Sequence, residues 1–120
     1  MIEELVGRVF ATRNAAHLAH WAAKGPGSYA KHVALDGFYN ELIDKIDTIV
    51  EMYQGAHGLI GDVILPKVDP TKIVQHIAEE ATWIADCRDD IAEDVDAIKN
   101  QIDDLVGHYL TSLYKLKNLA

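Results

Sequence analysis

Five side chains of this sequence have the types and the spacing of a metal site. They are His20, His32, Asp36, Asp47 and Glu51, at successive intervals of 12, 4, 11 and 4 residues. Histidine nitrogens and carboxylate oxygens together bind iron, manganese or zinc. The last four fall on one segment that the sequence predicts to be helical, and residues four apart on a helix lie one turn apart on one face. The spacing therefore gives two candidate ligand pairs, His32 with Asp36 and Asp47 with Glu51.

The two pairs are too far apart to share one metal ion within a single helix. Asp36 and Asp47 are separated by close to three turns, so they point nearly the same way, but about 16 Å of helix axis lies between them. A second copy of the helix running antiparallel would bring its other pair alongside. A two-fold dimer does this twice, because its contacts are reciprocal. Two interpretations follow: two unrelated pairs, or a site shared between two copies of the chain.

Apolar residues recur every three or four positions along most of the sequence, which predicts an all-α protein. We predict a first helix over residues 2–23 and a second over residues 28–54, with Ser28 as the cap of the second. The Gly-Pro-Gly sequence at 25–27 separates them. Glycines at 55, 58 and 61 end the second helix, and the connector that follows shows no helical period.

A capping aspartate followed by proline, Asp69-Pro70, predicts the start of the third helix. The boundary with the fourth helix falls at residues 89–94, where aspartates can cap, although no glycine or proline marks it. The alternative is one long bent helix. Four helices with short connections, apart from the crossing segment between the second and third, predict an antiparallel four-helix bundle that forms one domain over residues 1–120.

Composition limits the classes of function. The chain of 120 residues has 19 acidic and 11 basic side chains and a net charge of -8. This balance argues against DNA binding and favours attraction of cations. The acidic opening sequence MIEELVGRVF is not typical of a signal peptide, and no apolar run reaches the length of a membrane span. The lone Cys87 cannot form an internal disulfide, which is consistent with the cytoplasm, and we assign it to the core.

Residues 15–55 resemble the starvation-induced miniferritins, or Dps-type proteins. That family has a His-Trp pair ending its first helix, a glycine-containing turn, and then His-x-x-x-Asp and Asp-x-x-x-Glu on its second helix. The counterparts here are His20-Trp21, the turn at 25–27, and the two ligand pairs named above. The segment HYLTSLYKLKNL, which begins at His108, is similar to the family's closing helix.

The resemblance implies a ferritin-like bundle with a di-iron ferroxidase centre across a two-fold interface. One subunit would provide His20, His32 and Asp36, and its partner Asp47 and Glu51, with Glu51 bridging the two irons. Peroxide or dioxygen would oxidise Fe(II), and the product would be stored as mineral inside a cage of twelve subunits. The resemblance also has departures: the chain is short, the connector GLIGDVILPKV replaces a helix, and no lysine-rich tail is present.

Other interpretations of the same residues stay open. A ferritin-like structural or assembly protein could keep the bundle, and even the metal, without catalysis. The same dimer could hold zinc or manganese without redox chemistry. Each ligand also has an ordinary explanation, since histidines on apolar faces are often structural and carboxylates are usually solvated. We assign Trp21 to packing and His17 either to packing or to the support of a ligand. Glu80 is either a buried polar residue or a sign that the face of its helix is wrongly assigned. The other histidines, His57, His76 and His108, have surface or structural roles.

Overall fold

The computed structural model describes all 120 residues and consists of helices joined by loops. The elements are α1 (Ile2–Ala22), α2 (Ser28–His57), a short 3-10 helix η1 (Pro70–Lys72), α3 (Ile73–Ala92) and α4 (Asp96–Asn118). No β-strand is present. The predicted all-α class and the four predicted helices are therefore confirmed. None of these helices combines the length and the apolar character needed to cross a bilayer.

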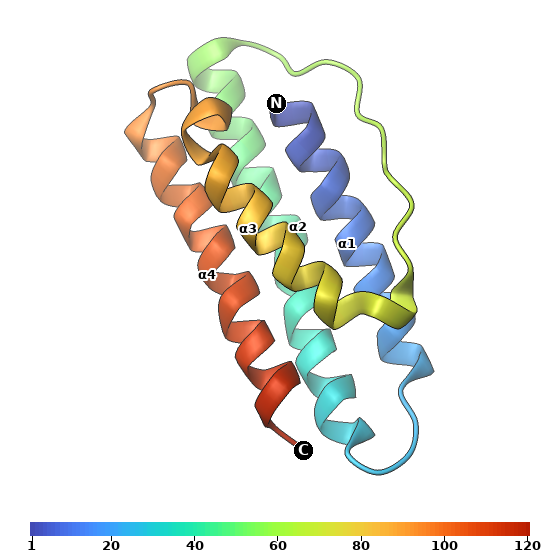
Figure 1. Cartoon of the computed structure of the whole chain (residues 1–120). Coiled ribbons are helices and arrows are strands. Elements are labelled where there is room, and N and C mark those ends of the chain that lie inside the picture. Colours follow the sequence, from blue (N-terminus) through green and yellow to red (C-terminus); the bar gives the residue numbers. More distant parts are fainter.

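The four helices lie side by side along the long axis of a molecule of 48 × 24 × 21 Å. Figure 1 shows α1 and α2 running in opposite directions around a tight loop, and α3 and α4 doing the same. Residues 58–69, which we call the strap, form an extended connection that returns along the outside of α1. The strap returns the chain toward the end of the bundle where α2 begins, so α3 runs in the same direction as α2.

A cluster of 24 buried residues fills the space between the helices. From α2 it includes Leu35, Leu42 and Ile49, which recur every seven residues and so lie on one side of the helix. Ile98 and Leu105 repeat this spacing on α4. Each such side chain stabilises the fold by about 1.5–3 kcal/mol when it is fully buried. Burial of its own stripe fixes how α2 is rotated about its axis, and therefore which of its residues face solvent.

The strap is held against α1 by close backbone contacts. A Cβ atom on Gly7 would lie 2.1 Å from the carbonyl oxygen of Ile64, so only glycine allows the strap to approach this closely. Glu3 accepts a hydrogen bond from the Gly61 amide at 2.8 Å, and Gln54 accepts one from the Ile60 amide at 3.1 Å. The strap is thus tied to both α1 and α2 although it has no secondary structure of its own.

The predicted start of the third helix is confirmed in its cap. The Asp69 carboxylate accepts hydrogen bonds from the Thr71 amide at 3.0 Å and from the Thr71 hydroxyl at 2.7 Å. These bonds lower the pKa of Asp69 below its ordinary value. Pro70 is the first residue of η1, which leads directly into α3.

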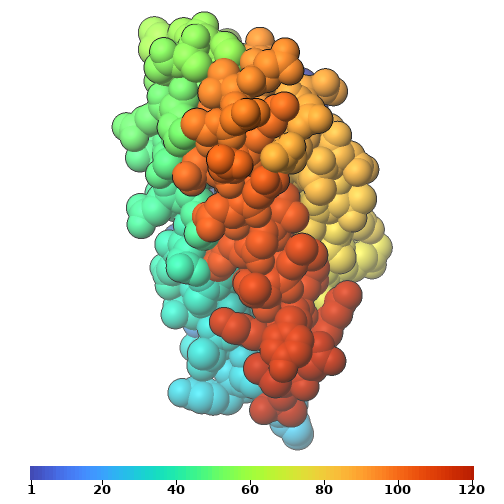
Figure 2. Space-filling model, turned by 90° about the vertical axis from the view of Figure 1, so that its left-hand side faces the viewer, coloured from blue at the N-terminus to red at the C-terminus, as the bar shows by residue number.

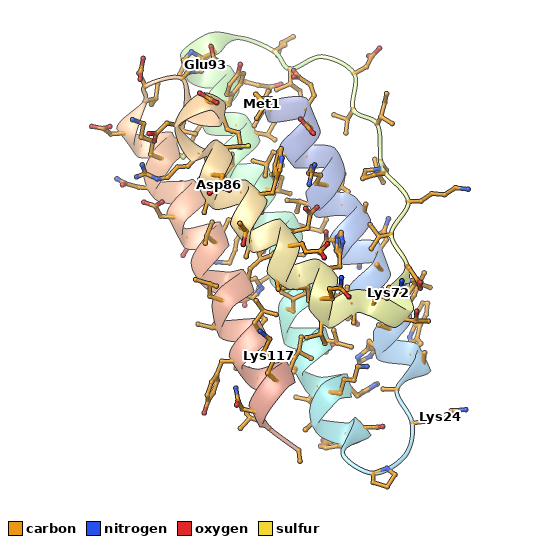
Figure 3. The ribbon with its side chains drawn as sticks, viewed as in Figure 1. Met1, Lys24, Lys72, Asp86, Glu93 and Lys117 are labelled. Carbon is orange, nitrogen blue, oxygen red and sulfur yellow. The ribbon has the colours of Figure 1, made fainter.

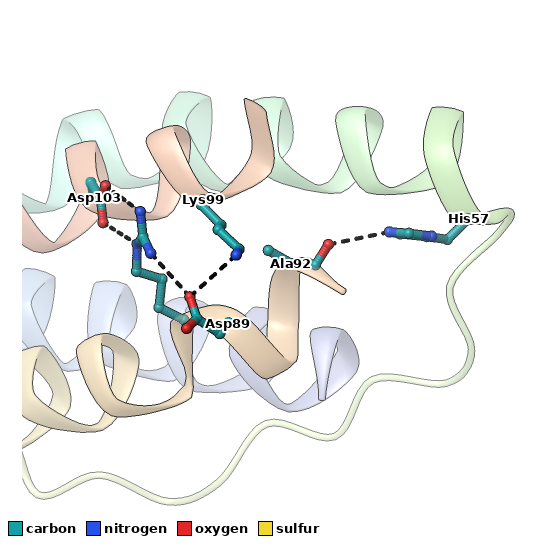
Figure 4. Close-up of polar contacts among 6 residues, drawn as sticks. His57, Asp89, Ala92, Lys99 and Asp103 are labelled. Carbon is teal, nitrogen blue, oxygen red and sulfur yellow. Dashed lines mark hydrogen bonds and ion pairs between the residues drawn. The ribbon is translucent and has the colours of Figure 1, made fainter. Parts of the chain in front are cut away.

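The corner between α3 and α4 falls inside the predicted interval, but its chemistry differs from the prediction. Glu93 and Asp94 end α3 with φ angles of 47° and 67°, in the left-handed region. No aspartate side chain caps α4, whose N-cap is Val95. Instead Arg88 reaches from α3 to Asp103 on α4 at 2.6 Å, and Lys99 lies 3.7 Å from Asp89 (Figure 4). His57 at the end of α2 donates to the Ala92 carbonyl at 3.3 Å.

The second helix differs from the prediction at both ends. It continues through Gly55 to His57, and the chain leaves it at Gly58, whose φ is 100°. Ser28 is the first helical residue rather than the cap, because Gly27 occupies the N-cap position with φ 79° and no side chain caps the helix. A left-handed residue at that position favours glycine, which explains the turn sequence better than a serine cap does.

Candidate histidine and carboxylate site

His20 and His32 form a reciprocal pair where α1 ends and α2 begins. The two rings stack with centroids 3.6 Å apart and an interplanar angle of 19°. Nδ1 of His20 donates to the main-chain carbonyl of His32 at 2.7 Å, and Nδ1 of His32 donates to the carbonyl of His20 at 3.0 Å. His20 is buried, at 9% exposure, and His32 is half-buried. The two histidines that the resemblance assigned to one subunit thus lie together within one chain.

These two hydrogen bonds decide the tautomer of each ring. A carbonyl oxygen can only accept, so both Nδ1 atoms carry their protons, and in the neutral rings both Nε2 atoms keep a free lone pair. No group of the chain is hydrogen-bonded to either Nε2 atom. Histidines that bind metals commonly donate their second ring N–H to a backbone carbonyl, which fixes the ring orientation. The pair is thus arranged so that Nε2 of each ring is the available ligand atom.

Asp36 lies one turn beyond His32 on the exposed surface of α2, and neighbouring side chains orient its carboxylate. Its Oδ1 accepts from the Tyr39 hydroxyl at 3.1 Å and from the Asn40 amide at 2.9 Å. The Tyr39 ring also packs edge-on against His20, with centroids 5.4 Å apart. Tyr39 therefore links the carboxylate to the histidine pair, and burial together with the bond to Asp36 raises the pKa of its phenol.

His17 extends this group of rings toward the end of α1. It stacks on Tyr39 at 4.2 Å, and its ring lies 4.2 Å from that of Trp21. Desolvation, followed by the charge of Arg13, lowers the pKa of His17. The packing role predicted for His17 is confirmed. Trp21 contacts His17 but is 67% exposed, so its assignment as a packing residue was wrong for most of its surface.

Asp47 and Glu51 lie farther along α2, one turn apart and both exposed. Neither carboxylate takes part in an ion pair or hydrogen bond within the chain. Nowhere in the molecule do three His, Cys, Asp or Glu side chains come close enough together to hold a metal ion. One chain thus brings His20 and His32 together without a third ligand from Asp36, and it leaves Asp47 and Glu51 apart from them. The assignment of these acids to a partner's site stays a prediction.

The remaining histidines are structural. Nε2 of His108 donates to the Phe38 carbonyl at 2.8 Å, and its Nδ1 lies 3.2 Å from Glu41, so this ring joins α4 to α2. His76 bonds to the Thr12 hydroxyl at 2.8 Å between α3 and α1. These roles agree with the surface or structural assignment made from the sequence.

Glu80 confirms the buried polar position predicted on α3. It is 5% exposed and pairs with Arg8 of α1 at 2.6 Å. The Arg8 guanidinium also lies 3.9 Å over the Trp83 ring. Cys87 is half-buried beside this core rather than fully inside it, and burial raises the pKa of its thiol. A raised pKa keeps the thiol protonated and argues against a reactive cysteine.

Sequence reasoning missed Tyr39 as the residue that positions Asp36. The signal was present, because Asp36 and Tyr39 are three residues apart and such pairs meet on a helix surface. It was hidden because Tyr39 also belongs to the apolar stripe of α2, where its ring is 5% exposed. Only the fold shows that its hydroxyl reaches out of the core toward the carboxylate.

Comparisons with known proteins place the chain in a family. Residues 20–116 match the model of the family described as "Family of unknown function (DUF5856)". The chain belongs to this family. Over 119 residues it is 32% identical to a protein of Enterobacteria phage T4 described as "Uncharacterized 14.6 kDa protein in mobD-ri intergenic region", with 95% of this chain and 86% of the T4 protein covered. No solved structure matches the chain.

These matches overturn the resemblance to the miniferritins. The chain is a DUF5856 protein related to a phage T4 protein, and the Dps-type assignment was wrong. The physical reason lies in the pattern that suggested it. His and carboxylate residues four apart recur on any polar helix face, so five such residues specify a spacing rather than a family. The strap, which has no helix before η1, is the visible departure in this part of the fold.

Proposed function

We propose that this DUF5856 protein binds Fe(II) between two copies of the chain and oxidises it, thereby sequestering iron. In this proposal one copy provides His20, His32 and Asp36, and the other provides Asp47 and Glu51. The bundle would have a ferritin-like arrangement and the two copies would pair through antiparallel α2 helices. The observation that carries the proposal is the reciprocal hydrogen bonding of the histidine pair, which leaves Nε2 of both rings free.

The carboxylates supply the second part of the argument. Asp36 has one oxygen engaged by Tyr39 and Asn40, which leaves Oδ2 without a partner in the chain. Asp47 and Glu51 are exposed and have no cationic partner, so they can approach another molecule without first breaking an ion pair. Imidazole nitrogen together with several carboxylate oxygens is a donor set that suits iron, and also manganese and zinc.

The proposed reaction needs an oxidant, for which we name hydrogen peroxide. Two Fe(II) ions each give up one electron, the O–O bond of the peroxide breaks, and two hydroxide ions form together with two Fe(III) ions. The side chains would hold the two ions roughly 3.5–4 Å apart, as in other two-metal sites. Iron is the substrate in this scheme, and the Fe(III) product is what the protein would sequester.

One observation favours a second candidate, a purely structural histidine pair. The two Nδ1 bonds tie the end of α1 to the start of α2 across the turn at residues 23–27. Such a clamp would stabilise the fold whether or not metal binds. In that case the exposed acids Asp47 and Glu51 are ordinary solvated residues, and their removal changes nothing that involves metal.

The first experiment measures anaerobic Fe(II) binding by calorimetry and the molar mass by light scattering. The proposal expects a dimer or larger oligomer and loss of Fe(II) binding in Asp47→Asn and Glu51→Gln. The matched control is Asp44→Asn, an exposed acid on the same helix, which should bind Fe(II) as the unaltered protein does. A strict monomer, or unchanged Fe(II) binding in Glu51→Gln, would reject the proposal in favour of the structural candidate.

The second experiment tests whether the site is shared between copies. His32→Gln and Glu51→Gln should each be inactive in peroxide-dependent Fe(II) oxidation, followed by ferric absorbance. When the two variants are unfolded and refolded together, half of the dimers are mixed, and each mixed dimer has one intact site out of two. The mixture should therefore recover about a quarter of the original activity. No recovery, with mixed dimers demonstrated by mass spectrometry, would exclude a shared site.

A further inference from the structure

The end of the molecule at the α1–α2 turn has a surface unlike the rest of the protein. We define the lysine end as residues 15–35 together with residues 110–120. These two segments contain Lys24, Lys31, Lys115 and Lys117 and not one aspartate or glutamate, although the chain has 19 acidic residues. The first carboxylate beyond it on α2 is Asp36. A strongly acidic protein thus has one end whose charged side chains, up to Asp36, are all lysines.

The opposite end carries most of the negative charge. Residues 86–104 contain eight acidic side chains and two basic ones. Figure 3 shows Asp86 and Glu93 toward one end of the bundle and Lys24 and Lys117 at the other. The molecule is 48 Å long, whereas charges in physiological salt are screened over about 8 Å. The lysine end therefore acts on its surroundings independently of the net charge of -8.

Exposed apolar side chains gather at the same end. Seven of the twelve exposed large hydrophobic residues belong to it: Leu18, Trp21, Tyr29, Val33, Leu110, Tyr114 and Leu119. Trp21 and Tyr29 are 67% and 80% exposed, respectively. Large exposed apolar surface beside cationic groups marks a site of interaction rather than ordinary surface. This grouping is not explained by the histidine and carboxylate site.

A groove runs between two of the helices at this end. It has a volume of about 680 Å³ and lies between the first turns of α2, with Tyr29 and Val33, and the end of α4, with Lys115 and Leu119. Figure 2 shows the start of α2 and the end of α4 side by side on this face. The groove is mostly apolar, with a lysine at its edge, so it fits a hydrocarbon segment that carries a negative charge.

We propose that the lysine end docks on the surface of an anionic lipid bilayer. Tryptophan and tyrosine favour the membrane–water interface, and lysine extends its charge toward lipid head groups while its stem packs against apolar surface. Single-stranded nucleic acid would also attract lysines and stack on aromatic rings. The aliphatic residues Leu18, Val33 and Leu119 have no role in base stacking, and they favour the bilayer. His20 and His32 of the proposed metal site lie within the lysine end, so docking is tested in the absence of metal.

The experiment measures cosedimentation of the whole protein with vesicles. Vesicles of equal parts phosphatidylglycerol and phosphatidylcholine should bind the protein, and vesicles of phosphatidylcholine alone should bind it far more weakly. Each lysine contributes about a factor of five near such a surface, so Lys115→Gln/Lys117→Gln should weaken binding roughly twenty-five-fold. The matched control, Lys45→Gln/Lys99→Gln, makes the same change in charge outside the lysine end, where these lysines face Asp104 and Asp89, and it should leave binding within about two-fold.

A second variant tests the apolar part of the contact. Trp21→Ser/Tyr29→Ser alters exposed residues and keeps all four lysines, and it should also weaken vesicle binding. In a Trp83→Phe background, the emission of Trp21 should shift to shorter wavelength on anionic vesicles. The proposal is overturned if anionic vesicles do not bind the protein, if the serine variant binds them as well as before, or if a labelled oligothymidylate binds at the lysine end while vesicles do not.

Discussion

The imidazole of His32 closes the end of α1 by donating from Nδ1 to the main-chain carbonyl of His20 at 3.0 Å. The last four carbonyls of a helix have no amide partner within it, and the carbonyl of His20 is one of these four. The His20 ring in turn donates a hydrogen bond to the His32 carbonyl at 2.7 Å, and the two rings stack on each other. The turn between α1 and α2 is thus fastened by two side chains that also present free Nε2 atoms.

This relationship predicts a stability change that is independent of metal. His32→Ala removes one hydrogen bond and the ring contact, and it leaves the His20 carbonyl without a partner. We expect the free energy of unfolding to fall by about 1–2 kcal/mol. Urea unfolding in the presence of EDTA measures it, with the adjacent exposed Lys31→Ala as the control. Equal stability of the two variants would show that the pair does not fasten the turn.

The contact of the strap with Gly7 predicts a strong effect of a single methyl group. Gly7→Ala would place Cβ 2.1 Å from the Ile64 carbonyl oxygen, a backbone atom that cannot move without displacing the strap. We expect a loss of about 1–3 kcal/mol in the free energy of unfolding and faster proteolysis within residues 58–69. The control, Gly55→Ala, meets nothing within 4 Å inside α2 and should stabilise the protein by up to about 1 kcal/mol. A Gly7→Ala variant as stable and protease-resistant as the parent would contradict the close contact.

The sequence predicts those parts of the fold that local patterns determine, and it fails where contacts between distant segments decide the structure. The apolar stripes and the Asp69-Pro70 start are local patterns, and the structure confirms them. The end of α2 was misjudged because Gly55 looks like a stop signal, whereas the helix there continues to His57. The corner at Glu93 and Asp94 was located but not explained, because its contacts come from other helices. Tyr53 of α2 donates a hydrogen bond to Glu93 and thereby supports that corner.

The candidate site was predictable only in part, because some of its contacts are local and others depend on the fold. The spacing gave the pairs His32 with Asp36 and Asp47 with Glu51, whereas only the resemblance placed His20 beside His32, and the structure brings these two together because both flank one short turn. Tyr39 was missed because its role depends on which way a buried ring points out of the core. The family was predicted wrongly because a spacing on a helix surface carries little information about ancestry. Whether Asp47 and Glu51 meet a partner depends on an interface that one chain does not contain.

The hydrogen bond between Glu3 and the Gly61 amide predicts a loss of stability in acid. It is the main cause that lowers the pKa of Glu3 below its ordinary value of 4.5. A lowered folded pKa contributes stability that is fully present above pH 4.5 and is lost as the pH falls through the folded value. Stability of the strap, followed by proteolysis or hydrogen exchange at residues 58–69, should decline below pH 4.5. Glu3→Gln keeps an acceptor oxygen but does not titrate, so the loss of stability in acid should be smaller in that variant. An unchanged loss would show that another group causes it.

The contact of Tyr53 with Glu93 predicts a change at the alkaline end. Hydrogen bonding to Glu93 and burial raise the pKa of Tyr53 from 10.0 to about 12. A raised folded pKa contributes stability that is present below pH 10 and is lost as the pH rises toward 12. Ultraviolet titration should show one tyrosine ionising near pH 12, and Glu93→Gln should lower that pKa because the neighbouring negative charge is gone. If the ionisation near pH 12 disappears in Tyr53→Phe, it belongs to Tyr53. If it persists in that variant, the contact between Tyr53 and Glu93 is contradicted.

The ion pair between Arg8 and Glu80 predicts that losing one partner costs more than losing both. Arg8→Met leaves the Glu80 carboxylate, only 5% exposed, without its guanidinium, and we expect the unfolding free energy to fall by about 2–3 kcal/mol, since Arg8 itself is partly exposed. In Arg8→Met/Glu80→Leu no buried charge remains unpaired, so most of that loss should be recovered. Thermal and urea unfolding of the two variants measure the difference. A double variant less stable than Arg8→Met would show that the pair itself stabilises the bundle.

The hydroxyl of Tyr109 predicts that removing a polar atom stabilises the protein. Tyr109 is fully buried on α4, its hydroxyl has no hydrogen-bond partner, and burial raises the pKa of its phenol. The nearby Thr12 hydroxyl, which is bonded to His76, acts to lower that pKa but does not reach hydrogen-bonding geometry with Tyr109. A buried hydroxyl without a partner costs about 1–3 kcal/mol, whereas the ring itself packs edge-on against Phe38 at 5.0 Å. Tyr109→Phe keeps the ring and removes the hydroxyl, so urea unfolding should show a gain in stability of about 1 kcal/mol. A loss of stability instead would mean that the hydroxyl is hydrogen-bonded in solution, and Thr12→Val should then produce a similar loss.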